Sequence, residues 1–187
     1  MASEFQRTKV AAVFDAMDSG RRGYLVAGDF QALAARWTAV RGVPPGSPQA
    51  ERLRTVMLHW WTSLSAASAN PRQVTIDDVL TVVDLLPTMS EAVTATADAM
   101  FDAIDENADD RLSQPEYRQL IETWNGRPTD TDEVFARLDL DADGHISREE
   151  FRRLWTQFWA GDDPEEPGTW VFGRVGPLSG VGGGEVG

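Results

Sequence analysis

The sequence predicts an all-α fold made of four helix-loop-helix units. Apolar residues recur at intervals of three and four along eight segments, which is the spacing of helices that bury one face. No segment alternates apolar and polar residues over the length of a useful β-strand. Two loops between helices carry acidic residues in the same twelve-residue pattern. With 187 residues, the chain is long enough to bury a sizeable apolar core.

The first half of the chain contains four predicted helices. Ser47 followed by Pro48 provides an N-cap and a first-turn proline for the third helix. Thr75 caps the fourth helix, which ends at Pro87. The apolar stripes of the four helices are Val10 to Met17, Phe30 to Trp37, Leu53 to Leu64 and Val79 to Val83.

The second half repeats this arrangement with four further helices. Ser90 opens the first of them, and Gly126 with Pro128 ends the second. The last helix ends at Gly161. The apolar stripes are Val93 to Ile104, Tyr117 to Trp124, Val134 to Leu138 and Phe151 to Trp159. Residues 173–187 include seven glycines, so we expect this tail to be mobile.

The charge of the chain is strongly negative and unevenly distributed. Acidic residues outnumber basic residues by 30 to 17, which gives a formal net charge of −13. Residues 98–166 carry 20 acidic and 7 basic residues and therefore hold the whole surplus. This charge argues against binding to nucleic acids or anionic lipid, and it favours cations as partners.

Other features of the composition exclude several classes of protein. The chain has no cysteine, which excludes disulfides, thiolate metal sites and cysteine nucleophiles. Its first residues lack the apolar core of a secretory signal, and no run approaches the eighteen apolar residues of a membrane span. We therefore expect a cytoplasmic monomer.

Residues 139–150 match the pattern of a calcium-binding loop at every specified position. Three aspartates supply side-chain oxygens, the seventh residue a backbone carbonyl, the ninth a water-bridged contact and the last a bidentate carboxylate. In this order the predicted ligands are Asp139, Asp141, Asp143, His145, Ser147 and Glu150. Gly144 permits the left-handed turn around the ion. The side chain of His145 should point to solvent, since its carbonyl faces the metal.

Residues 105–116 repeat this design 34 positions earlier. The corresponding ligands are Asp105, Asn107, Asp109, Arg111 through its carbonyl, Ser113 and Glu116. The departure is Asp110, which stands where glycine belongs. Aspartate tolerates positive φ at about 1 kcal/mol relative to glycine. We therefore expect a working calcium site that is weaker than the one in residues 139–150.

The first two loops have lost calcium ligands. In residues 18–29, the positions of ligands hold Gly20, Arg22, Val26 and Asp29, and the cationic arginine opposes a bound ion. In the second loop, the first three ligand positions hold Ala67, Ala69 and Pro71. We expect both loops to serve as packing partners. The expected pairs between loops are Leu25 with Val74, and Leu112 with Ile146.

The four units resemble the sarcoplasmic calcium-binding protein family and its bacterial calerythrin-like members. The shared features are a long connection between the first two loops, and third and fourth loops that keep calcium ligands. Residues 162–173 are similar to the C-terminal segment of that family. The resemblance covers residues 4–173 and implies four EF-hand units in two pairs, packed into one compact body. It implies calcium buffering or signalling in the cytosol.

The chain divides on this basis into three parts. Residues 1–96 form an N-terminal EF-hand pair with degenerate loops, and residues 97–161 form a C-terminal pair with calcium-binding loops. Residues 162–187 form a C-terminal segment and the glycine-rich tail. Trp170 to Phe172 would be costly to expose, so we expect them to dock between the halves and close an apolar cavity.

Two functions from different classes fit these features. The first is a calcium buffer or sensor without catalytic activity, with two sites in the C-terminal half. The second is a calcium-regulated binder of a hydrophobic ligand or a partner helix. The chain has seven tryptophans, and the run from His59 to Trp61 could line or rim a cavity. A photoprotein-like oxygenase is a distant third. No nucleophile motif or phosphate loop supports other chemistry.

Overall fold

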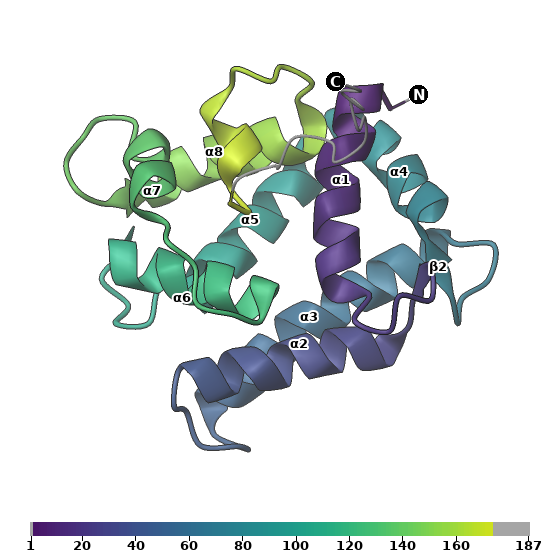
Figure 1. The fold of residues 1–187 in the computed structure, drawn as a ribbon, viewed down its shortest axis with the longest axis horizontal. Coiled ribbons are helices and arrows are strands. Elements are labelled where there is room, and N and C mark those ends of the chain that lie inside the picture. The colour runs from purple at the N-terminus through teal and green to yellow at the C-terminus, as the bar shows by residue number, and fades with distance from the viewer. Residues whose placement is uncertain (1, 174–187) are drawn as a thin grey trace, which may run out of the picture.

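The computed structural model describes residues 2–173 and consists mainly of helices. The eight α-helices within these residues are α1 (Glu4–Met17), α2 (Ala27–Val40), α3 (Pro48–Ala67), α4 (Ile76–Leu85), α5 (Ser90–Ile104), α6 (Gln114–Asn125), α7 (Asp132–Leu138) and α8 (Arg148–Ala160). Two short 3-10 helices are η1 (Leu86–Thr88) and η2 (Pro167–Trp170). The predicted all-α fold class is confirmed (Figure 1). The tail predicted to be mobile lies, after Gly173, outside the described residues.

Helix boundaries follow the local signals of the sequence. The hydroxyl of Ser47 accepts a hydrogen bond from the backbone N–H of Ala50 at the start of α3. Thr75 caps α4 and Ser147 caps α8 in the same way, each with an acidic partner three residues later. Gly126 ends α6 at a φ of 67°, the left-handed conformation that glycine adopts freely.

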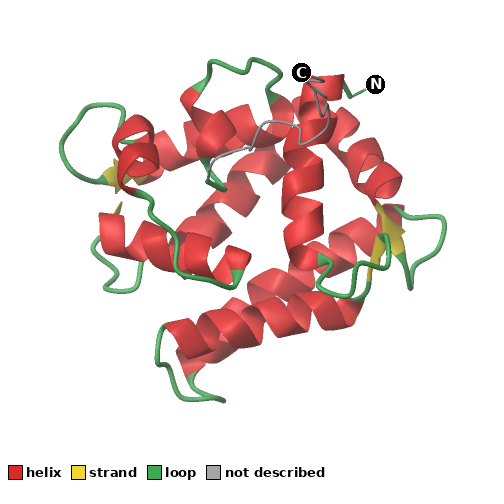
Figure 2. Cartoon of the chain, viewed as in Figure 1, coloured by secondary structure: helices red, strands yellow, loops and turns green. Residues whose placement is uncertain are grey.

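Two short antiparallel strand pairs join the loops. Strand β1 (Tyr24–Leu25) pairs with β2 (Val74–Thr75), and β3 (Arg111–Leu112) pairs with β4 (Ile146–Ser147). Leu25 lies opposite Val74 and Leu112 opposite Ile146, so both predicted contacts between loops are confirmed. All four side chains are buried. Figure 2 shows the two strand pairs on opposite sides of the molecule.

One continuous apolar core joins the two halves of the chain. The long helices α2 and α3 lie side by side, and α2 also contacts α6 of the C-terminal half (Figure 1). Trp37 of α2, Trp124 of α6 and Trp155 of α8 are each at most 2% exposed and belong to the same cluster. Residues 2–173 therefore form one body. The proposed boundary between residues 96 and 97 falls inside α5, and the division into pairs stays a prediction.

The segment after α8 packs against the C-terminal half. The ring of Phe172 contacts four aromatic rings, with centroid distances of 4.8 to 5.8 Å. These rings belong to Trp124, Trp155, Phe158 and Trp159. The hydroxyl of Tyr117 donates to the carbonyl oxygens of Trp170 at 3.1 Å and Val171 at 3.2 Å. Residues 170–172 therefore dock on the folded chain, as predicted, but these contacts lie on the C-terminal half, whereas the sequence predicted docking between the two halves.

No helix among residues 2–173 is long and apolar enough to cross a membrane.

Lys9, the single lysine of the chain, joins α1 to the end of α8. Its side chain is fully buried, and Nζ donates to the carbonyl oxygens of Gln157 at 3.2 Å and Gly161 at 2.9 Å. Desolvation lowers the pKa of Lys9 from 10.5 to about 8, against the attraction of Asp162 and Glu166. Folding therefore places the amino group of Lys9 in surroundings that favour its neutral form.

The stability of the protein should rise with pH because of Lys9. Between about pH 8 and 10.5 the unfolded chain keeps a proton that the folded chain has released from Lys9, so raising the pH favours the folded state. We expect the free energy of unfolding of the wild type, minus that of Lys9→Met, to increase by about 1–2 kcal/mol from pH 7.5 to 9.5. Urea denaturation at saturating calcium measures both. A difference that does not change with pH contradicts the lowered pKa.

Candidate metal centre

Three of the four loops between paired helices share one backbone conformation. In each, the fourth and sixth residues of the loop have positive φ, which turns the chain back on itself. The φ values are 48° at Arg21 and 78° at Gly23, 57° at Ala108 and 64° at Asp110, and 58° at Ala142 and 88° at Gly144. Asp110 therefore adopts the left-handed conformation that the missing glycine would provide.

The same hydrogen bond orients the first aspartate of each of these loops. The backbone N–H of the sixth residue donates to its carboxylate at distances of 2.7, 3.0 and 2.8 Å. The donor and acceptor pairs are Gly23 with Asp18, Asp110 with Asp105, and Gly144 with Asp139. Each aspartate thus faces the inside of its loop.

Residues 139–150 bring carboxylates together most closely. One carboxylate oxygen from each of Asp139, Asp141 and Asp143 lies within 4.8 Å of the others. Glu150 accepts hydrogen bonds from the N–H of Leu140 at 3.0 Å and of Ser147 at 2.7 Å, so its carboxylate ties the two ends of the loop together. Carboxylates this close repel one another unless a cation lies among them. The oxygen donors fit a hard divalent cation such as calcium.

Residues 105–116 repeat the arrangement with one carboxylate fewer at the ligand positions, where Asn107 corresponds to Asp141. Glu116 accepts from the N–H of Glu106 at 2.9 Å and of Ser113 at 2.8 Å. Asp105 and Glu116 are buried. Asn107 accepts from the N–H of Asp109 at 2.9 Å, the bond that Asp141 makes with Asp143 in the later loop. Among the described residues, three acidic groups within 4.8 Å occur in residues 139–143 and not here.

The remaining predicted ligands lie where the loops pair. The backbones of Arg111 and Ser147 face each other in the β3–β4 pair, next to the residues that share the core. His145 has a partly exposed side chain, with Nδ1 3.9 Å from a carboxylate oxygen of Asp143. The structure thus places the twelve predicted ligands in two adjacent loops: Asp105, Asn107, Asp109, Arg111, Ser113, Glu116, Asp139, Asp141, Asp143, His145, Ser147 and Glu150.

Arg148 connects the two loops, a role that the sequence analysis missed. Its Nε donates to Asp110 at 2.7 Å, and a terminal nitrogen donates to Asp102 at 2.8 Å. The guanidinium carbon lies 4.3 Å from the ring centroid of Phe101. The residue that replaces glycine in one loop is therefore an ion-pair partner of the other loop. The opposite charges at these positions were the only signal in the sequence.

Arg41, at the end of α2, is a second cationic residue that lies next to residues 105–116 and that the sequence did not indicate. It donates a hydrogen bond to the carbonyl oxygen of Ile104, the residue before the first predicted ligand. Desolvation lowers the pKa of Arg41, and the nearby Glu106, Glu116 and Asp105 act in the opposite direction. The N-terminal half thus contributes charge to this loop.

The other two loops differ from each other. In residues 18–29, the guanidinium of Arg22 contacts both acidic side chains that face the loop, Asp18 and Asp29. In the second loop, helix α3 continues through Ala67, and the hydroxyl of Ser68 donates to the carbonyl oxygens of two loop residues. This loop keeps its packing role through β2, as predicted.

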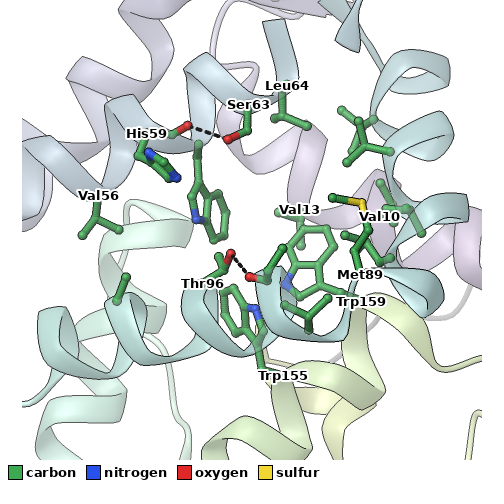
Figure 3. Close-up of a pocket in the computed structure, with 18 of the residues that line it drawn as sticks. Val10, Val13, Val56, His59, Ser63, Leu64, Met89, Thr96, Trp155 and Trp159 are labelled. Atoms are coloured by element: carbon green, nitrogen blue, oxygen red, sulfur yellow. Dashed lines mark hydrogen bonds between the residues drawn. The ribbon is translucent and has the colours of Figure 1, made fainter. Parts of the chain in front are cut away.

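A cavity of about 570 Å³ lies between helices of both halves (Figure 3). Its lining is mostly apolar and comes from α1, α3, α4, η1, α5 and α8. Trp155 and Trp159 of α8 form part of the wall, and His59 is exposed at the rim, as expected for this residue. Trp60 also lines the cavity, with its ring centroid 5.6 Å from that of Trp155 and 5.8 Å from that of Trp159.

The C-terminal segment does not close this cavity, which corrects the sequence-based expectation. Trp170 to Phe172 do not belong to its lining. Phe172 lies behind the wall, against Trp155 and Trp159. The reason is that these residues find enough apolar contact on α6 and α8 without reaching the cavity.

Comparison with known proteins agrees with this geometry. Residues 94–156 match the EF-hand domain pair family. Comparison with curated protein sequences gives no significant match.

Several solved structures have the same fold. A coelenterazine-binding protein from Renilla muelleri in the calcium-loaded apo form is 22% identical, with a TM-score of 0.69 over 95% of this chain and 100% of that chain. A Streptomyces coelicolor calcium-binding protein is 18% identical, with a TM-score of 0.66 over 84% and 99%. Calcium-loaded apo-aequorin from Aequorea victoria is 18% identical, with a TM-score of 0.68 over 87% and 94%.

The EF-hand fold and calcium as the bound ion are thereby confirmed. The narrower resemblance to sarcoplasmic calcium-binding proteins and calerythrin stays a prediction.

Glu150→Gln should weaken the later site far more than Glu149→Gln. Glu150 joins both ends of its loop, whereas Glu149 is exposed and lies outside the ligand positions. Both variants remove one negative charge. We expect the first to lower calcium affinity on the order of 100-fold at one site, because a bidentate carboxylate is lost, and the second to change it less than about threefold. Isothermal titration calorimetry measures both, and equal affinities in the two variants contradict the ligand assignment.

Proposed function

We propose that this chain is a cytoplasmic calcium-binding protein without catalytic activity, which buffers or senses calcium through two sites in residues 105–150. The observation that carries the proposal is the position of the last acidic residue in each loop. Glu116 and Glu150 each accept hydrogen bonds from the start and the end of their own loop. The ends of both loops are thereby already close together, so an ion would meet a largely formed set of ligands.

The electrostatics of the C-terminal half support the same function. Residues 98–166 carry 20 acidic and 7 basic residues, so the half repels itself when no cation is bound. Arg148 and Arg152 offset part of this charge through Asp98 and Asp102. The hydrogen bonds from Arg152 hold the pKa of Asp98 below its usual range. Neither arginine pairs with a predicted ligand carboxylate, so those carboxylates are left for the ion.

Calcium should therefore stabilise the C-terminal half much more than the N-terminal half. An ion that binds only the folded state adds about 4 kcal/mol at a thousandfold excess over Kd. Calorimetry should count two ions per chain. Hydrogen exchange should show calcium-dependent protection in residues 98–160 and little change in residues 4–67. Equal protection of both halves, or a count other than two, contradicts the proposal.

The cavity favours a second candidate, a calcium-regulated binder of a hydrophobic ligand. A volume of about 570 Å³ lies within the range of small-molecule sites. Trp60 and Trp159 line this cavity, and their indole nitrogens are buried and have no hydrogen-bond partner among the described residues. Two proteins with similar structures, the coelenterazine-binding protein and okadaic acid binding protein 2.1, are named for organic ligands.

Helices α8 and α5 would link calcium binding to this cavity. Helix α8 carries Glu150 in its first turn, and Trp155 and Trp159 face the cavity one and two turns later. Helix α5 lines the cavity with Thr96 and ends just before Asp105. A shift of either helix on calcium binding would therefore move the cavity wall. A partner helix in the same space is the alternative occupant.

Filling the cavity should separate the two candidates. Ala99 of α5 lines the cavity, whereas Thr94 on the same helix does not. We expect Ala99→Trp to remove most of the calcium-dependent fluorescence increase of the apolar dye 1-anilinonaphthalene-8-sulfonate, while Thr94→Trp keeps it. The calcium count should stay at two in both variants. If calcium leaves the dye signal of the wild type unchanged, the buffer function stands and the ligand-binding candidate is rejected.

A further inference from the structure

The first loop has the backbone of an ion-binding loop although it lacks the ligands. Arg21 and Gly23 have the same left-handed φ as their counterparts in the two calcium loops. The N–H of Gly23 donates to Asp18 at 2.7 Å, as the sixth residue does in those loops. Strand β1 then pairs with its neighbour in the same register as β3. The loop is folded as if an ion were present.

A guanidinium joins the two carboxylates of this loop. A terminal nitrogen of Arg22 lies 2.5 and 2.6 Å from the two oxygens of Asp29, and Nε lies 3.5 Å from Asp18. Asp18 and Asp29 are only 5% and 8% exposed. The hydrogen bond to Asp29 also raises the pKa of Arg22, which keeps the cation charged.

These carboxylates occupy the first and last ligand positions of the loop. In a calcium loop, the ion joins those two positions from the centre. Asp29 is one methylene shorter than Glu116 or Glu150, and the side chain of Arg22 reaches it from the fifth position. We infer that the guanidinium of Arg22 takes the place of calcium in the first loop and holds it in the ion-loaded conformation at every calcium concentration.

This assignment gives Arg22 a structural role in the first loop. As a residue in a decayed site, it would only repel an ion. In the structure, it neutralises two buried carboxylates that would otherwise repel each other. The third loop position is Gly20, where an added Cβ would come within 3.2 Å of Nε of Arg22. The small residue thus leaves room for the guanidinium.

A consequence for the cavity rests on the proposed ligand-binding function. Phe14 and Met17 of α1 and Leu25 of β1 line the cavity on the side of the first loop. With the loop held by Arg22, this wall keeps its position without calcium. The wall formed by α5 and α8 borders the two calcium loops. Calcium would then act on one side of the cavity only.

Restoring three side chains tests the assignment directly. We compare Gly20→Asp, Arg22→Asp and Asp29→Glu together with the control that carries Gly20→Asp and Asp29→Glu but keeps Arg22. If Arg22 fills the ion position of a preformed loop, calorimetry should count three calcium ions in the triple variant and two in the control. Two ions in the triple variant, or three in the control, overturn the inference. The wild-type count in the same titrations tests the proposed C-terminal sites separately.

Two single substitutions test the same inference even if the triple variant does not fold. Arg22→Gln and Arg21→Gln each remove one positive charge from the loop, and both arginines are exposed, but Arg22 makes ion pairs with Asp18 and Asp29 and Arg21 does not. In EDTA, we expect Arg22→Gln to lower Tm by about 5 °C and to speed hydrogen exchange in residues 18–29. Arg21→Gln should match the wild type. If the two variants melt and exchange alike, Arg22 does not hold the loop.

Discussion

Carboxylates gathered inside a short loop repel one another, and the fold of this protein depends on a positive charge placed among them. Asp139, Asp141 and Asp143 bring oxygens within 4.8 Å, and in the proposed function calcium supplies the balancing charge there. In the first loop, Arg22 supplies it from within the chain. The second loop has no such carboxylates at its first ligand positions and keeps only the strand contact. The loops that gather carboxylates thus meet the same electrostatic requirement in different ways.

Helices connect the predicted calcium loops with the rest of the molecule. Glu150 lies in the first turn of α8, whose later turns carry Trp155 and Trp159 into the wall of the cavity. Phe172 packs against the other side of those rings. Arg148 ties the start of α8 to the neighbouring loop through Asp110. Under the proposed function, a change at the ion would therefore reach an apolar cavity and not only the surface.

Local features were predictable from the sequence, and contacts between distant residues were not. The caps at Ser47 and Thr75 and the pairing of Leu25 with Val74 follow from spacing and from loop position. Arg22 was interpreted as opposing an ion, because its charge is visible in the sequence but the direction of its side chain is not. The contacts of Phe172 depend on three-dimensional packing that the apolar pattern does not specify. The cavity depends on space left between helices, which no motif encodes.

The position of each cation tests this account most directly. Anomalous diffraction from crystals of the full chain grown with calcium would locate the ions, and the same maps would show the side chain of Arg22. The account predicts two peaks, one within residues 105–116 and one within residues 139–150, with the guanidinium of Arg22 between Asp18 and Asp29. A peak inside residues 18–29, or the absence of a peak in either C-terminal loop, would contradict it.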